Sequence, residues 1–134
     1  MSPTEFAYGV KTTIDASLDG AHARLVAALK DEGFGILTEI DIAAAFKEKL
    51  GADFRPYRIL GACDPPLAHQ ALGADLDIGL LLPCNLVIYE ADEPGKTVVA
   101  AIDPVAQLGV TGRDDIKPLA NEVRERLERV LAEI

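Results

Sequence analysis

The sequence predicts a single-domain α+β fold with two layers, in which helices pack on one face of a mainly antiparallel or mixed, curved sheet. Three observations predict it. The 134 residues are the usual length of one domain, and 49% apolar against 26% charged residues suit a packed core. Runs with strand character alternate with amphipathic helical stretches, and no repeat or long linker divides them.

The first half of the chain predicts three strands and two helices. Residues 6–14 are rich in aromatic and β-branched side chains, which indicates a strand with one buried face. Ser17 is a good N-cap for a helix that closes at Gly33, and Asp41 for a second helix that closes at Gly51. Further strands are expected over residues 34–40 and 55–62.

Asp64 followed by Pro65 is a helix-start signal, and the short helix should end at Gly73. Pro65 and Pro66 carry no backbone N–H, so the first donor that Asp64 can cap is that of Leu67.

The last part of the chain predicts a hairpin and a long helix. Residues 86–89 and 96–102 are β-rich, and the Ala-Asp-Glu-Pro-Gly segment between them favours a turn. A loop containing Gly109 and Gly112 should lead to a helix from about Ile116, with Glu122–Arg126 and Glu125–Arg129 as i,i+4 ion pairs on its wet side.

Helices on one side leave the other sheet face without a cover. A sheet this apolar rarely exposes its second face to water, so we expect a homodimer.

The formal charge of −9 disfavours nucleic acid and anionic membranes as partners. The N-terminus has no secretory pattern, and the longest apolar stretch, residues 78–89, is too short to span a bilayer. We therefore expect a cytoplasmic protein whose two cysteines are free thiols.

The exception to the acidic character is a basic group that forms either a small anion site or a solvated face: Lys47, Lys49, Arg55 and Arg58.

The candidate binding residues lie between positions 58 and 85. Cys63 precedes a helix N-terminus, whose dipole stabilises a thiolate, although the carboxylate of Asp64 opposes this. If the strands ending at Cys63 and beginning at Cys84 are neighbours, both thiols and His69 converge at one end of the sheet. Inert burial is the commoner state for each thiol, and a structural position on the outside of its helix, or bracing the loop before Asp77, is the commoner role for His69.

The amide of Asn85 can contact a ligand or satisfy a loop carbonyl. The spacing of Cys63, His69 and Cys84 matches no compact metal signature, so no metal is expected. No serine lies in a nucleophile elbow and there is no phosphate loop. Whether the chain is an enzyme, and which cofactor it uses, stay open at this point.

Four segments resemble the bacterial and archaeal family called domain of unknown function 302. They are residues 33–41 (Gly-Phe-Gly-Ile-Leu-Thr-Glu-Ile-Asp), 54–57 (Phe-Arg-Pro-Tyr), 60–63 (Leu-Gly-Ala-Cys) with 65–68 (Pro-Pro-Leu-Ala), and 79–85 (Gly-Leu-Leu-Leu-Pro-Cys-Asn). The resemblance extends from Tyr8 to about Ile102 and implies a compact α+β fold, a curved sheet backed by helices and a tendency to dimerise. It implies no activity, substrate or cofactor.

Three functions follow as hypotheses. The first is a dimeric binding module whose pocket for a small anion or apolar ligand includes Cys63, Asp64, His69, Cys84, Asn85 and Arg58. The second is a redox protein or enzyme that uses Cys63 or Cys84. The third is an assembly domain that acts through its oligomer surface.

Overall fold

A computed structural model describes residues 3–134. Six strands form one antiparallel sheet in the order β1-β2-β6-β5-β4-β3. The strands are β1 (Thr4–Phe6), β2 (Gly9–Ile14), β3 (Gly35–Asp41), β4 (Tyr57–Cys63), β5 (Cys84–Glu90) and β6 (Thr97–Ile102). The helices are α1 (Leu18–Asp31), α2 (Ile42–Leu50), α3 (Pro65–Ala74), α4 (Pro104–Gly109) and α5 (Lys117–Glu133), with short 3-10 turns η1 (Leu76–Leu81) and η2 (Asp114–Ile116).

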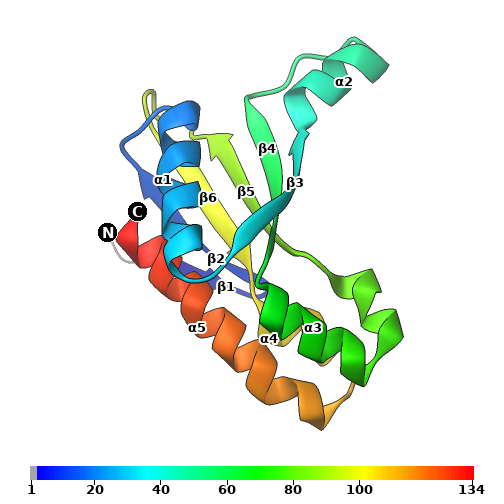
Figure 1. Cartoon of the computed structure of the whole chain (residues 1–134). Helices are drawn as coiled ribbons and strands as arrows, with labels where there is room; N and C mark the ends of the chain where they lie inside the picture. The colour runs from blue at the N-terminus through cyan, green and yellow to red at the C-terminus, as the bar shows by residue number, and fades with distance from the viewer. Residues whose placement is uncertain (1–2) are drawn as a thin grey trace.

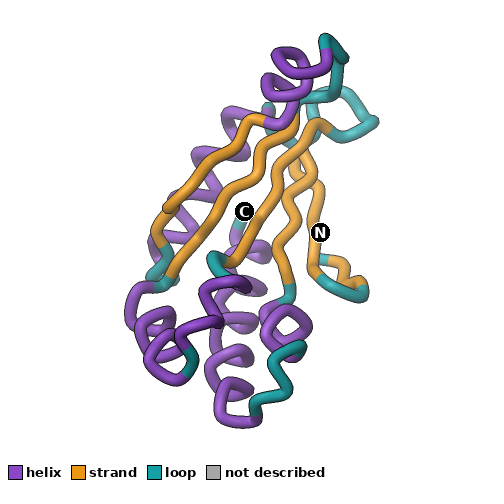
Figure 2. Tube along the Cα trace, turned by 90° about the vertical axis from the view of Figure 1, so that its right-hand side faces the viewer, coloured by secondary structure: helices purple, strands orange, loops and turns teal. Residues whose placement is uncertain are grey.

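The α+β, two-layer prediction is confirmed. Helices α1 and α5 cover one face of the curved sheet, and Figure 2 shows the strands in front of them with the other face uncovered. The main core lies between these layers, where the inward side chains of α1 and α5 pack on those of the central strands. Its fully buried large side chains include Leu25, Leu29, Leu60, Leu86, Ile88 and Leu127.

Helix α5 packs across the back of the sheet because its apolar positions recur at helical spacing. The buried side chains are Ala120, Val123, Leu127, Val130 and Leu131. A second, smaller cluster joins α3, η1 and α4 to the first part of α5, at the end of the molecule opposite α2 (Figure 1). This cluster positions the candidate site.

Three predicted helix starts are confirmed at the level of the cap. Ser17 accepts a hydrogen bond from the backbone N–H of Gly20, and Asp41 accepts one from Ala44. Asp64 accepts from the N–H of Leu67 at 3.3 Å, the donor that the two prolines leave. At the end of α2, Gly51 adopts φ +64°, a left-handed conformation that favours glycine.

Three local predictions were wrong. Residues 6–14 are not one strand: Ala7 and Tyr8 form a turn between β1 and β2. The segment after Asp103 is not a loop but begins with α4, because Asp103 caps the N–H of Val105 and Pro104 occupies the first turn. Arg129 pairs with Glu32, the C-cap of α1, at 2.9 Å and not with Glu125, whereas the predicted Glu122–Arg126 pair is present at 3.0 Å.

Helix α2 projects from the body of the molecule beyond the ends of β3 and β4 (Figure 1). The helix is amphipathic, yet none of its residues is buried, and Leu50 is 73% exposed.

Candidate functional site

An apolar pocket with a volume of about 250 Å³ lies where the ends of β4 and β5 meet α3, α4 and α5. Hydrocarbon side chains supply most of its walls, among them Phe34, Leu67, Leu72, Leu82, Leu108 and Val123. Cys63, Asp64 and Cys84 also line it. We call this cavity the thiol pocket.

The two thiols reach the same pocket because β4 and β5 are antiparallel neighbours. Cys63 is the last residue of β4 and Cys84 is the first of β5, and Cys84 lies opposite Ala62 in the register. The two cysteines, although far apart in the sequence, therefore lie at the same end of the sheet.

Gly61 allows the chain to pack closely beside the pocket. A Cβ at this position would lie 2.3 Å from Oγ1 of Thr38 and 2.7 Å from Cγ of Pro83, closer than any real contact. The absence of a side chain lets Pro83, which also lines the pocket, rest directly on β4.

Neither thiol is activated. Burial raises the pKa of Cys84 to about 11, and the neighbouring Cys63 adds to this shift. Burial also raises the pKa of Cys63, and the charge of Asp64 acts in the same direction. The sequence suggested that the dipole of α3 lowers the pKa of Cys63, but the effect of burial is larger. Both thiols are therefore protonated at neutral pH.

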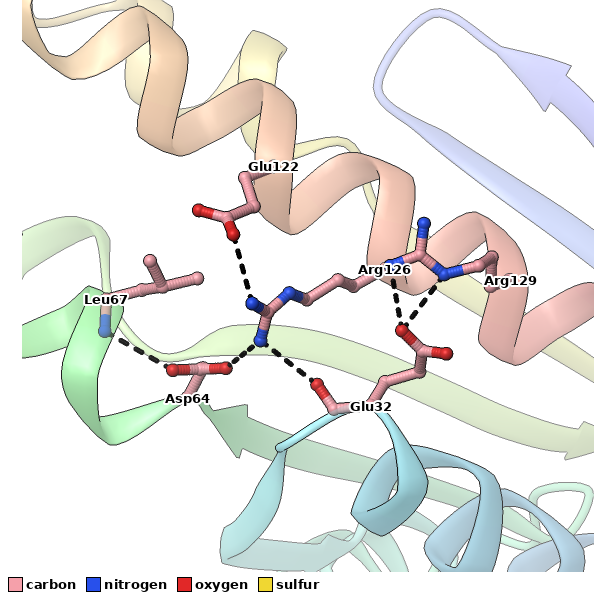
Figure 3. Close-up of polar contacts among 6 residues, drawn as sticks. All are labelled: Glu32, Asp64, Leu67, Glu122, Arg126 and Arg129. Carbon is pink, nitrogen blue, oxygen red and sulfur yellow. Dashed lines mark hydrogen bonds and ion pairs between the residues drawn. The ribbon is translucent and has the colours of Figure 1, made fainter.

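Asp64 is committed to structural contacts. Its side chain is 5% exposed; one oxygen caps Leu67 and the other accepts a hydrogen bond from Nη1 of Arg126 at 2.6 Å (Figure 3). The ion pair neutralises the only carboxylate at the pocket wall.

Arg126 holds three elements together. Besides Asp64 it contacts the backbone oxygen of Glu32 at 3.2 Å and the carboxylate of Glu122 at 3.0 Å, while Arg129 binds the Glu32 side chain (Figure 3). The end of α1, the start of α3 and the middle of α5 are thus joined. Sequence reasoning assigned Arg126 only its helical neighbour, because nothing local indicates a partner 62 positions away.

The other predicted site residues lie elsewhere. His69 is exposed on α3 and does not line the thiol pocket. Asn85 points to the uncovered sheet face, where it lines a separate hollow. Arg58 lies on the helix-covered face and binds Asp19 of α1 at 2.9 Å.

Three of the four cations in the basic group form ion pairs. Lys47 binds Asp53 at 2.9 Å and Arg55 binds Asp92 at 3.0 Å, so these cations already have carboxylate partners, as Arg58 does. Among residues 3–134, no cluster of three or more His, Cys, Asp or Glu side chains is arranged to hold a metal ion.

Comparison with known proteins identifies the family. The family described as "Domain of unknown function DUF302" matches residues 10–134. The chain belongs to this family. The match continues through α4 and α5, beyond the limit near Ile102 that the resemblance suggested.

A solved DUF302 structure has the same fold. The crystal structure of an uncharacterized conserved DUF302 protein from Bacillus stearothermophilus is 30% identical in sequence, with a TM-score of 0.86. The superposition covers 96% of this chain and 98% of the other. No curated protein matches the chain. No helix in the described part of the DUF302 chain is long and apolar enough to cross a bilayer.

Proposed function

We propose that this DUF302 protein binds a small, uncharged, largely apolar molecule in the thiol pocket. The observation that carries the proposal is a cavity of about 250 Å³ with hydrocarbon walls, slightly smaller than the pockets of about 300 Å³ or more that bind drug-sized ligands, which suits a small molecule. Two neutral thiols add polarisable surface without a charge.

The charge distribution favours an apolar ligand over an anion. The N-terminus of α3 is already capped by Asp64, and Pro65 and Pro66 have no N–H to donate. Arg126 is occupied by Asp64 and Glu122, so no free cation reaches the pocket wall. A carboxylate or phosphate would find no partner there.

The raised pKa values argue against a redox or nucleophilic function. Such chemistry needs a thiolate, and burial disfavours the thiolate of both Cys63 and Cys84. We therefore assign the thiols to the wall of the pocket, in contact with the ligand but not in reaction with it.

Filling the pocket should abolish binding. Ala68 of α3 lines the pocket, whereas Ala74 is exposed at the end of the same helix. Straight-chain primary alcohols of increasing length serve as uncharged probes. We expect them to raise the melting temperature of the wild type and of Ala74→Phe, because a ligand at a hundred times its Kd stabilises by about 2.7 kcal/mol.

Ala68→Phe, if folded by circular dichroism, should show no shift with the same alcohols, and calorimetric titration should show no heat of binding. A flat response of the wild type across the series would contradict the proposal. So would a folded Ala68→Phe variant that binds as well as Ala74→Phe, because the phenyl ring would then occupy a space that the ligand does not use.

A further inference from the structure

A second hollow, with a volume of about 450 Å³, lies on the sheet face that α1 and α5 leave uncovered (Figure 2). It forms where Ala100 of β6 lies in register between Val87 of β5 and Lys11 of β2, because the methyl group of Ala100 is the shortest side chain of that row. Its volume is within the range of pockets that bind small molecules. We call it the tyrosine hollow, because it is lined by all three tyrosines of the chain: Tyr8, Tyr57 and Tyr89.

Aromatic rings form two sides of the tyrosine hollow. On one side the rings of Tyr57 and Tyr89 are stacked, with centroids 5.3 Å apart and planes 5° from parallel. On the other side Phe6 packs edge-on against Tyr8, which is 66% exposed. Gly9 lets the Phe6 ring rest on β2, because a Cβ there would lie 2.6 Å from Cζ of Phe6. Such sides favour a planar aromatic ligand, since aromatic pairs gain from stacked and edge-to-face contacts.

The polar groups of the tyrosine hollow are a free cation and neutral donors. Among the described residues that line it, only Lys11 is charged; its Nζ lies 5.6 Å from the centroid of the Phe6 ring. Lys11 forms none of the ion pairs of residues 3–134. The side-chain amide of Asn85 has no hydrogen-bond partner in the same part of the chain. Burial and the neighbouring Tyr89 raise the pKa of Tyr57, so its hydroxyl is neutral at pH 7.

The tyrosine hollow differs in charge from the chain as a whole. The charge of −9 disfavours anions in general, yet no described Asp or Glu lines this site. Glu5 and Glu39, on the two edge strands, bind an arginine of α5 and a histidine of α1, so both carboxylates point to the helix-covered face. Salt screens charges that lie farther away than about 10 Å at 0.1 M. Lys11 therefore determines the sign of the charge that a bound molecule meets.

We propose that the tyrosine hollow binds a small planar aromatic molecule that carries one carboxylate. Its ring lies over Ala100 and stacks against Tyr89, and its carboxylate pairs with Nζ of Lys11. Tyr89 is the tyrosine of the stacked pair that lies nearer to Lys11, because β5 is between β4 and β6. The strands of Tyr89 and Lys11 are two spacings apart, about 10 Å, so one or two fused rings bridge the space between the side chains.

This inference does not depend on the function proposed for the thiol pocket. The two sites have no lining residue in common, and the thiol pocket offers no free cation. The tyrosine hollow therefore selects a different class of ligand, an aromatic anion in place of an uncharged apolar molecule.

Nuclear magnetic resonance of the full chain, with carbon-13 in the tyrosine and phenylalanine rings, tests the proposal. The probe is 2-naphthoate, for which we expect a Kd of about 1 mM or below, as is usual for a ligand of this size. Its ring current should shift the signals of all three tyrosines. The signals of Phe34, which lines the thiol pocket, should stay in place.

A pair of lysine variants tests the contact with the carboxylate. Lys11→Gln should weaken the binding of 2-naphthoate about tenfold, because a charge-assisted hydrogen bond is lost. It should leave the binding of the neutral 2-naphthamide unchanged. Lys30→Gln is the matched control, since it removes the same charge from an exposed position on α1, and should bind both probes as the wild type does. Lys11 is exposed as well, so Lys11→Gln keeps the fold, which circular dichroism verifies.

Tyrosine signals that stay unchanged up to about 10 mM 2-naphthoate would overturn the proposal. So would equal losses for Lys11→Gln and Lys30→Gln, because net charge would then attract the probe. A shift of Phe34 in place of the tyrosines would move the acid to the thiol pocket. Sedimentation equilibrium tests the other occupant of this face: a dimer that excludes 2-naphthoate would assign the uncovered face to a second copy and overturn the proposal. A failure of the alcohols to bind would contradict only the function proposed for the thiol pocket.

Discussion

At the scale of single residues, Asp64 shows how one side chain fixes the corner of the thiol pocket. It caps α3 and pairs with Arg126 of α5, and only 5% of its side chain is exposed. Asp64→Asn keeps an oxygen for the cap and removes the ion pair, and should lower the free energy of unfolding by about 1 to 3 kcal/mol in urea denaturation. Asp64→Ala should cost roughly a further 1 kcal/mol, since the cap is lost as well.

Glu122→Gln is the control for this prediction, because Glu122 binds the same Arg126 from an exposed position. Its effect should stay below about 0.5 kcal/mol. Equal losses for Asp64→Asn and Glu122→Gln would mean that burial adds nothing to the Asp64–Arg126 pair.

The two cysteines should alkylate slowly in the folded protein. With a pKa of about 11, Cys84 is a thiolate in about one molecule in ten thousand at pH 7. The iodoacetamide reaction of the Cys63→Ser variant, followed by mass spectrometry, should accelerate about tenfold per pH unit between pH 7 and 10. In the Cys84→Ser variant only Cys63 can react. Because its pKa is also raised, Cys63 should react more slowly than free cysteine at pH 7.

Denaturant provides the control, because both thiols should then react at the rate of free cysteine. A thiol in the folded protein that outpaces free cysteine at pH 7 would revive the redox hypothesis.

At the scale of elements, the sequence predicts what is encoded locally. The caps at Ser17, Asp41 and Asp64 depend on residues three positions away, so they could be predicted down to the donor. The same Asp-Pro signal at Asp103 starts α4, but the glycines that follow favoured a loop. Beyond the cap, Leu108 packs into the cluster with α3 and α5, and this tertiary contact, which local sequence does not encode, stabilises the short helix.

The candidate site was predictable only in part for the same reason. The sequence placed Cys63 and Cys84 together only on the condition that their two strands are neighbours, and the pairing of β4 with β5 meets that condition. Asn85 follows Cys84 directly, yet successive residues of a strand face opposite sides, so it lies on the uncovered face. Arg126 was missed as a partner of Asp64 because the path of α5 across the pocket depends on the packing of the whole layer.

At the scale of the whole molecule, the helical layer is tied together by ion pairs that depend on pH. Hydrogen bonding to Arg129 holds the pKa of Glu32 below its usual value, and this pair joins the end of α1 to α5. A carboxylate with a lowered pKa in the folded state stabilises the protein above its unfolded pKa, about 4.3 for glutamate, and loses that contribution as the pH falls through the folded value.

Removing Arg129, the partner of Glu32, should therefore lower the stability of the protein only at pH values where the Glu32 carboxylate is ionised. Arg129→Gln should lower the melting temperature slightly at pH 7, because Arg129 is exposed, and the difference from wild type should disappear by about pH 3. Lys30→Gln removes the same charge from α1, where Lys30 forms none of the ion pairs of residues 3–134. A loss with Arg129→Gln that persists at pH 3, or that Lys30→Gln reproduces at pH 7, would show that net charge and not the Glu32–Arg129 contact holds these helices together.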